Sequence, residues 1–343
     1  MGFTKPPSES SLPMNHPALM TLLPATVLCG LLGTFIPAAG QEPAEPSTRH
    51  AAAQAFLATL EPDELDSAGR DFSDPARHGW SFFPARREAL RLGDLDAEER
   101  GALEAFLATA LSKDGITKLR EVLLVEPVSD RGGGVVTGPE EYHLTFFGAP
   151  SADTPWAWRL EGHHVALNQT LVGGRVIAAT PSFLGSSPLR NDDGVEPLRR
   201  EVEAARRVVD MLDVDARAGV SVDEVPGEIV SGMTISWQLP EAEGRSLAEL
   251  PEPARKALRD LAAEHVSIHA RDVSERFLDG WDRLDPGKIH FAWFGAVPGK
   301  GGHGYRLQGP EWVMEYVNVQ ARANHVHTVW RTLDGEFIPL AER

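Results

Sequence analysis

The sequence predicts an α+β fold in which an antiparallel sheet is built from two strand groups that are distant in sequence, with helices flanking it. Alternating, β-branched and aromatic segments run over residues 142–179 and return over residues 289–330. Residues 47–125 before the first group and residues of about 196–285 between the groups show helical apolar spacing. Strands on both sides of a helical insert pair most simply in one sheet, so we expect a single domain over residues 41–343.

Two domains divided near Glu196 are the alternative interpretation. The length of 343 residues and the hydrophobic content of 42% suffice for one large core or for two smaller ones. We find no internal repeat in the sequence.

The N-terminus carries an apolar run from Ala18 to Ala39 that ends in small residues and precedes an acidic, Pro-rich stretch. This pattern is typical of a secretory signal, so we expect residues 1–40 to be cleaved. An uncleaved anchor helix is the alternative, because the run approaches the roughly 20 residues that span a bilayer. Cleavage removes Cys29, and export without disulfides fits a bacterial periplasm or exterior. We therefore expect a secreted or periplasmic protein with no stable membrane insertion after cleavage.

The first part of the mature chain is predicted to be helical. An Ala-rich helix is expected at residues 47–60, and a packed loop follows at residues 69–92. Residues 96–112 and 115–123 have the apolar spacing of a helical hairpin. The glycines within residues 130–139 mark a flexible connector to the strands.

The first strand group is expected at residues 142–148, 156–161, 164–172 and 175–179, and a loop is expected at residues 181–196. The helical insert is expected to contain helices at residues 198–212, from Pro253 onward, and at residues 273–284. The second strand group is expected at residues 289–295, 305–308, 312–316 and 325–330.

The formal charge is −17, from 33 Lys and Arg against 50 Asp and Glu. Such a surface repels phosphate backbones on average, so we expect no nucleic acid partner and keep a small molecule as the substrate class. One cysteine cannot form an internal disulfide or a thiolate zinc site. A metal would therefore be held by nitrogen and oxygen ligands.

Two dense pairs of histidines are the candidate metal ligands. His325 and His327 alternate along a predicted strand, so their side chains share one face. His163 and His164 are adjacent and should point to opposite faces of a regular strand, so only one of them is expected to join the site unless Gly162 marks a bulge. Two imidazoles on one strand and a third from a neighbour can hold zinc, copper or iron as a divalent ion.

Three charged residues lie near these histidines in the predicted strands. Glu161 and Glu315 are candidates for a further ligand or a general base, and Arg331 is a candidate for binding an anionic substrate group. With a bound metal, hydrolysis is the least demanding chemistry, since the ion lowers the pKa of water, and oxidation at copper or iron is the alternative reaction. The sequence therefore suggests an exported metal-dependent hydrolase.

A structural role for the same residues is the alternative. Histidines and tryptophans can form a hydrogen-bonded polar core, which would suit a binding or scaffold protein of the cell envelope. The spacing of His265 and His269 lacks the glutamate of a zincin, so we interpret both as core histidines. A metal-free hydrolase that uses Ser182 with a histidine base ranks lowest, because no nucleophile motif supports it.

An ordered series of short strings resembles a known family. The strings are TPWAWRLEGHHVALNQTLVGG, ATPSFLGSSP, IHFAWFGA, YRLQGPEWVMEYVN and NHVHTVWR, preceded by HGWSFFPARREALRL and LSKDGITKLREVL. In this order they are similar to DUF3500, an uncharacterised family whose members often carry export signals. The resemblance implies a single domain over roughly residues 50–337 and brings no established catalytic residues.

Overall fold

The computed structural model describes residues 48–133, 135–234, 237–296, 301–333 and 335–337. These residues belong to one compact unit, Pro43–Arg343. The expected signal at residues 1–40 lies outside the described residues. Among the described residues, no helix has the length and apolar character needed to cross a bilayer.

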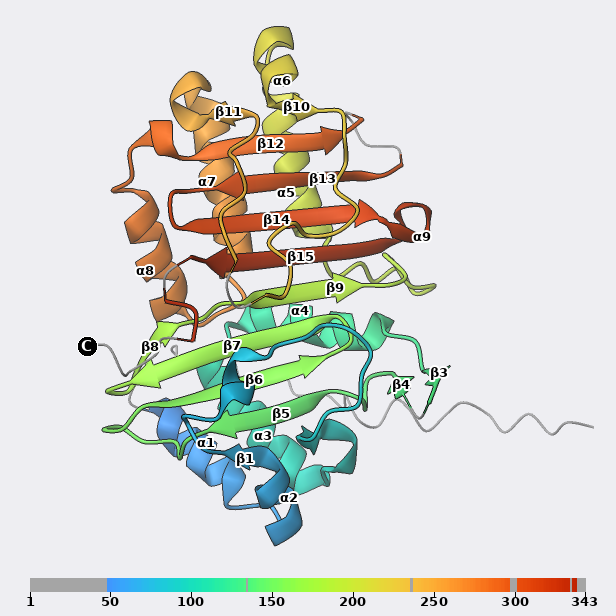
Figure 1. Ribbon diagram of the computed structural model, residues 1–343, viewed down its shortest axis with the longest axis vertical. Coiled ribbons are helices and arrows are strands. Elements are labelled where there is room, and N and C mark those ends of the chain that lie inside the picture. The colour runs from blue at the N-terminus through green and yellow to red at the C-terminus, as the bar shows by residue number, and fades with distance from the viewer. Residues whose placement is uncertain (1–47, 134, 235–236, 297–300, 334, 338–343) are drawn as a thin grey trace, which may run out of the picture. The chain divides into compact units, whose positions relative to one another are not determined.

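Helices and strands follow the order of the two predicted groups (Figure 1). The helices are α1 (Arg49–Leu57), α2 (Pro62–Ala68), α3 (Ala97–Ala110), α4 (Lys113–Val125), α5 (Arg199–Asp210), α6 (Val214–Val220), α7 (Glu252–Val266), α8 (Arg271–Trp281) and α9 (Gln320–Ala323). The first strands are β1 (Gly69–Arg70), β2 (Leu90–Arg91), β3 (Ser129–Gly132), β4 (Val135–Thr137), β5 (His143–Phe147), β6 (Trp156–Gly162), β7 (Val165–Val172), β8 (Arg175–Ala178) and β9 (Ser182–Ser186). The later strands are β10 (Ser221–Val222), β11 (Arg245–Ser246), β12 (His290–Gly295), β13 (His303–Gln308), β14 (Trp312–Val319) and β15 (His325–Thr332).

The predicted helical hairpin is present as α3 and α4, and local sequence explains both starts. The Asp96 carboxylate accepts the backbone N–H groups of Glu98 and Glu99, and the Glu99 side chain accepts the N–H of Asp96 in a capping box. Ser112 caps α4 by accepting the N–H of Gly115. Leu103, Phe106 and Leu107 of α3 are buried against the sheet.

The main sheet is mixed, which corrects the prediction of an antiparallel sheet. Its order is β1-β5-β6-β7-β9-β15-β14-β13-β12-β10, with β2, β8 and β11 paired beside this path. Most pairs are antiparallel, but β1 runs parallel to β5 and β10 runs parallel to β12. These two edge strands have two residues each, too short to produce an alternating pattern in the sequence. The predicted α+β class is otherwise confirmed, with both strand groups in one sheet.

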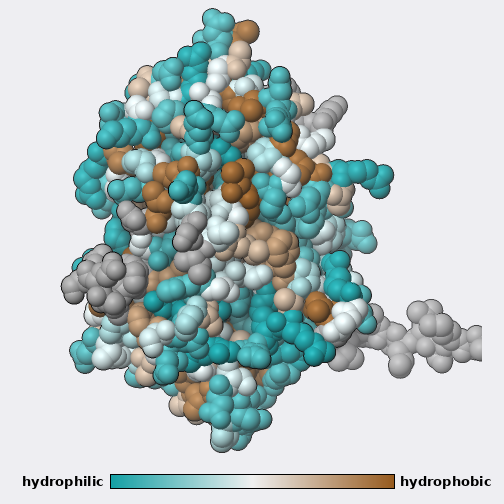
Figure 2. Space-filling model, in the orientation of Figure 1, coloured by the Kyte–Doolittle hydropathy of each residue, from teal (hydrophilic) through white to brown (hydrophobic). Residues whose placement is uncertain are grey.

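Strand β9 lies in the segment for which the sequence predicted only a loop. It pairs with β7 and with β15, and thereby joins the two strand groups. Helices cover one face of the sheet, and coil segments cross the other face (Figure 1). On the coil side, Trp80, Phe82, Phe183 and Ile229 belong to a small second core. Figure 2 shows this side as largely hydrophilic, with hydrophobic residues in small separate patches.

The structure reveals an internal repeat that was not evident in the sequence. The order α1, α2, β1, β2, α3, α4, β5, β6, β7, β9 recurs as α5, α6, β10, β11, α7, α8, β12, β13, β14, β15. Strand pairing recurs as well: β5–β6 and β12–β13 have the same register, as do β6–β7 and β13–β14. In each half the first strand of the meander pairs with one short parallel strand and one short antiparallel strand.

The two halves meet at the β9–β15 pair and at a bridge between the ends of two helices. Past the end of α3, Leu111 pairs antiparallel with His269, which follows α7. Equivalent ion pairs cross between the halves in the two directions, from Arg49 of α1 to Asp272 of α8 and from Arg200 of α5 to Asp114 of α4. The halves are therefore related by an approximate two-fold axis.

Candidate metal centre

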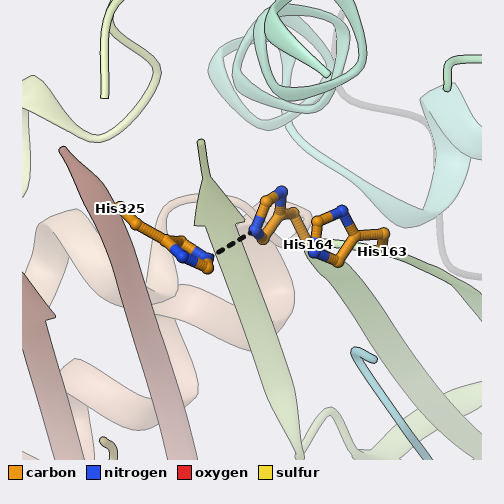
Figure 3. Close-up of side chains that lie close together, drawn as sticks. All are labelled: His163, His164 and His325. Atoms are coloured by element: carbon orange, nitrogen blue, oxygen red, sulfur yellow. Dashed lines mark hydrogen bonds between the residues drawn. The ribbon is translucent and has the colours of Figure 1, made fainter. Parts of the chain in front are cut away.

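Three histidines converge where the two halves of the sheet meet. His163 and His164 form the turn between β6 and β7, and His325 begins β15 (Figure 3). One ring nitrogen from each of the three residues lies within 4.8 Å of the other two. The Nε2 atoms of His164 and His325 are 2.9 Å apart. A tetrahedral ion with bonds of 2.0–2.1 Å sets a nitrogen spacing of roughly 3.3 Å, so this cluster is close to the size of a metal site.

The adjacent pair joins the cluster because it occupies a turn and not a strand. Gly162 and Val165 pair across the hairpin, which leaves His163 and His164 as its two loop residues. His164 has a φ of 71°, in the left-handed region that residues other than glycine rarely adopt. Both rings can therefore lie on one side of the hairpin, with their centroids 3.6 Å apart. The expectation of opposite faces assumed a regular strand.

Several contacts hold His164 in this conformation. Its backbone C=O accepts the N–H of Gly185 at 2.8 Å, and its own N–H donates to Phe82 at 3.4 Å. The residue is fully buried. A left-handed residue costs about 1–3 kcal/mol, so the surrounding contacts must supply at least that much to hold the ring in place.

A single carboxylate orients two of the rings. Glu126, just past the end of α4, accepts from the Nδ1 of His163 through Oε1 and from the Nδ1 of His164 through Oε2, each at 2.6 Å. Burial alone would raise the pKa of Glu126, but the bonds from the two histidines outweigh it and lower this pKa. With Nδ1 donating to Glu126, the Nε2 of each ring carries a lone pair, which is the arrangement typical of metal-binding histidines. The Nε2 of His164 accepts the Nε2–H of His325, so an ion would take the place of that proton.

The cluster favours neutral imidazoles. Burial, which outweighs the bond to Glu126, lowers the pKa of His164 to about 4. Burial together with the neighbouring rings of His327, His164 and His163 lowers the pKa of His325 to about 3. Because only a neutral imidazole has a lone pair to offer, these rings are ready to bind a metal near neutral pH.

His327 lies beside the cluster on the same face of β15 as His325, with ring centroids 4.6 Å apart. Its Nδ1 contacts both carboxylate oxygens of Glu228, at 2.7 and 2.8 Å. Gly185 of β9 lies next to this group: a Cβ there would approach His164 Cδ2 to 2.7 Å and His327 Cδ2 to 2.9 Å. A glycine at this position therefore leaves the space that both rings occupy.

The two acidic candidates have other partners. Glu161 forms an ion pair with Arg159 at 3.0 Å and accepts the N–H of Ser81 at 3.1 Å. Glu315 accepts the N–H groups of Val230 and Ser231, at 3.1 and 2.9 Å, and so fastens the coil across the sheet. Neither belongs to the histidine cluster.

Arg331 is also committed to the protein. Its guanidinium donates to Glu336 twice and to the backbone oxygens of Ser231, Gly232 and Thr234. These bonds occupy all five N–H donors, and the residue is 0% exposed. Arg331 therefore anchors the coil and has no donor left for an anionic substrate.

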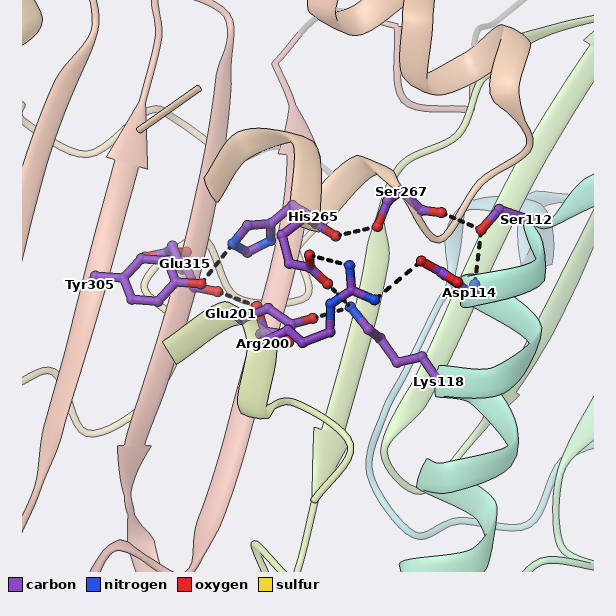
Figure 4. A network of polar contacts seen from close by, with 12 residues as sticks. Ser112, Asp114, Lys118, Arg200, Glu201, His265, Ser267, Tyr305 and Glu315 are labelled. Atoms are coloured by element: carbon purple, nitrogen blue, oxygen red, sulfur yellow. Dashed lines mark hydrogen bonds and ion pairs between the residues drawn. The ribbon is translucent and has the colours of Figure 1, made fainter. Parts of the chain in front are cut away.

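The remaining candidate histidines are hydrogen-bonded within the core. His265 contacts the hydroxyl of Tyr305 at 2.9 Å (Figure 4). His269 lies between the Nε2 of Gln169 and the Oγ of Ser182, each at 3.1 Å. The side-chain oxygen of Gln169 accepts from the indole N–H of Trp158, which identifies the other amide atom as the NH2 group. This NH2 group donates to His269 Nδ1. The proton of His269 is then on Nε2, so this ring cannot act as a base toward Ser182.

Sequence reasoning missed the two glutamates that hold the rings. Glu126 follows α4 and precedes Pro127, a pattern that marks a helix end and gives no sign of a ligand. Glu228 lies in coil, where nothing in the spacing indicates a contact with β15. Only the folded chain brings these carboxylates to the histidines.

Comparison with known proteins places the chain in a family. A family model described as a protein of unknown function, DUF3500, matches residues 43–338. No curated protein and no solved structure matches the chain. Because the match covers most of its length, the chain belongs to the DUF3500 family.

Proposed function

We propose that this DUF3500 protein binds one divalent metal ion through the Nε2 atoms of His163, His164 and His325. The arrangement of Glu126 carries the proposal, because one carboxylate orients two imidazoles toward a third. Three protein ligands with one open position are typical of catalytic zinc, which makes zinc the ion that we expect.

We propose hydrolysis as the reaction. An ion held by three imidazoles lowers the pKa of a bound water to about 7 and so supplies hydroxide near neutrality. The protein's own residues would hold the imidazole rings in position. Glu126 orients two of them, and Glu228 orients His327 beside them. Phe82 and Phe183 pack against the His327 ring, with centroids 5.0 and 5.2 Å away. The substrate class is a small molecule.

Metal analysis of the purified mature protein tests the binding step. We expect about one ion per chain, and we expect His163→Ala and His325→Ala each to lose it. His327→Ala should retain the ion, because His327 lies outside the three-residue cluster. His290→Ala, a half-buried histidine at the start of β12, is the matched control. A stripped protein that rebinds no zinc would contradict the proposal.

A panel of chromogenic esters and phosphate esters tests the reaction. Activity that disappears with a chelator, returns with zinc and is absent in His325→Ala supports hydrolysis. Tight zinc binding with no turnover of any substrate would favour a non-catalytic role.

A binding or scaffold protein of the cell envelope remains a second proposal, supported by the direct contact between His164 and His325. It predicts a melting temperature that does not change with a chelator. Histidine substitutions should then lower this temperature by several degrees, as the loss of a buried hydrogen bond does.

We also propose export, on the evidence of the apolar run from Ala18 to Ala39. N-terminal sequencing of the protein from its native cells should find a start near residue 40. An intact Met1 in the cytoplasmic fraction would contradict export.

A further inference from the structure

The repeat defines a second location that corresponds to the metal centre. The turn between β13 and β14, at Pro310 and Glu311, is the counterpart of the turn at His163 and His164. In both turns the backbone C=O of the second residue accepts an N–H from the next strand of the sheet or the residue just after it. Gly185 donates to His164 at 2.8 Å, and Leu333 donates to Glu311 at 2.6 Å.

This second location has none of the three histidines at its equivalent positions, and a cavity lies there. By the same correspondence, Leu284 takes the place of Glu126, and Ile177 takes the place of His325. Both residues line a cavity of about 310 Å³. A cavity of this size is at the lower end of the range for small-molecule sites.

Aromatic side chains form the cavity wall. Phe277 of α8 packs against Trp312 and Trp330 with ring centroids 5.3 and 5.1 Å away, and Trp281 lies 5.5 Å from Trp312. These contacts hold the rings in place, so the wall is formed before any ligand arrives. A flat apolar body is the shape that such a wall accepts.

Two charged residues line the cavity, Arg276 of α8 and Glu311 of the β13–β14 turn, and Arg276 is the cation of the two. Arg276 of α8 lines the cavity, and within the described part of the chain its guanidinium forms no hydrogen bond and no ion pair of 4 Å or less. A guanidinium that is free to form two parallel bonds is suited to a carboxylate. Thr180 and Thr332 bond to each other at 2.7 Å, which uses one of their two hydroxyl hydrogens and leaves the other able to donate.

We propose that this cavity binds a small carboxylate with an aromatic body, independently of the metal centre. The aromatic body would lie against Phe277 and the tryptophans, and the carboxylate would pair with Arg276.

The test uses 3-phenylpropionate as the probe and the full mature protein, with binding followed by calorimetry and by tryptophan fluorescence. We expect binding that persists with a chelator and in His325→Ala, so that a failed metal site would not obscure the result. The neutral amide of the probe should bind at least about tenfold more weakly, because it cannot form the charge-assisted pair.

Two variants test the location. Arg276→Gln should weaken the probe at least about tenfold, and Gly280→Leu should abolish binding. Gly280 lines the cavity in α8, and a Cβ there would meet no atom within 4 Å, so a side chain can be introduced at this position without a clash at its first atom. The matched controls are Arg271→Gln on the same helix and Gly101→Leu, another helical glycine with open space.

Equal binding by the wild type, Arg276→Gln and Gly280→Leu would overturn the proposal. So would the absence of binding at millimolar probe, or equal affinity for the acid and its amide.

Discussion

His164 shows how one residue can decide the geometry of a site. A strand conformation would send His163 and His164 to opposite faces, whereas the positive φ of His164 brings the two rings side by side. The histidine pairs themselves could be predicted from the sequence, because the spacing is visible there. The turn could not, since its conformation depends on contacts with Phe82 and Gly185.

The bonds of the two Glu126 oxygens to His163 and His164 predict how a substitution of Glu126 changes zinc affinity. Glu126→Gln should weaken zinc binding about 10–100-fold, because an amide has one oxygen and cannot accept from two Nδ1–H groups. Competition with a chromophoric chelator measures the affinity. Glu121→Gln on α4 is the control and should bind zinc as the wild type does. An unchanged affinity in Glu126→Gln would contradict the assigned role.

The buried His269 predicts a pH dependence of stability. Burial is the main cause that lowers the pKa of His269 to about 3, while the unfolded chain titrates at the ordinary value of 6.5. Between these two values the unfolded state binds the extra proton, so the free energy of unfolding falls as the pH falls from 6.5 toward 3. One such group contributes a slope of about 1.4 kcal/mol per pH unit.

His269→Gln should remove this contribution and leave the other titrating groups unchanged. Urea unfolding of both proteins at several pH values between 6 and 4 measures the two slopes. Identical slopes would show that His269 does not stay neutral in the folded state.

At the scale of elements, long helices and strands could be predicted because each buries one face. The hairpin of α3 and α4 and the strands from β12 to β15 follow their predicted positions closely. The short β9 was missed because Pro181 and Pro188 flank it and read as a loop. Its place in the sheet comes from β7 and β15, which are distant in sequence.

The contact between α4 and the α5–α7 pair depends on a buried charge. Lys118 of α4 pairs with Glu201 of α5 and, at 3.1 Å, with Glu264 of α7 (Figure 4). Burial opposes the charge on Lys118, but the two glutamates outweigh it and raise the pKa of this lysine. Lys118→Met should therefore cost about 3–5 kcal/mol of unfolding free energy, because it leaves Glu201 buried without a partner.

Chemical unfolding with a second substitution separates charge from packing. The double variant Lys118→Met with Glu201→Leu should recover much of the loss, since no uncompensated charge remains at Glu201. The exposed Lys113→Met on the same helix should stay within about 0.5 kcal/mol of the wild type. A double variant as unstable as the single one would contradict this account.

At the scale of the whole molecule, the repeat explains how the two strand groups form one sheet. Equivalent strands have the same register, but most of their side chains differ, so comparing the residues of the two halves reveals little similarity. One signal was present: Arg159-Leu160-Glu161-Gly162 and Arg306-Leu307-Gln308-Gly309 end corresponding strands. Short matches of this kind gain meaning only when the pairing is known.

The crossed contacts between the halves predict a single unfolding transition. The β9–β15 pair, the Leu111–His269 bridge and the partly buried Arg49–Asp272 ion pair all join one half to the other. Calorimetry should give one peak whose calorimetric and van't Hoff enthalpies agree. Two resolved transitions would instead support separate domains divided near Glu196.

The absence of a side chain at Gly185 suggests how other members of the family can be divided into two groups. Any larger residue at the corresponding position would collide with two imidazoles, so such a relative could not assemble the same cluster. The residue at this one position of an alignment would divide the family into chains with glycine, which have space for both rings, and chains with a larger residue, which do not. Comparing zinc content across this divide would test the centre without altering any histidine.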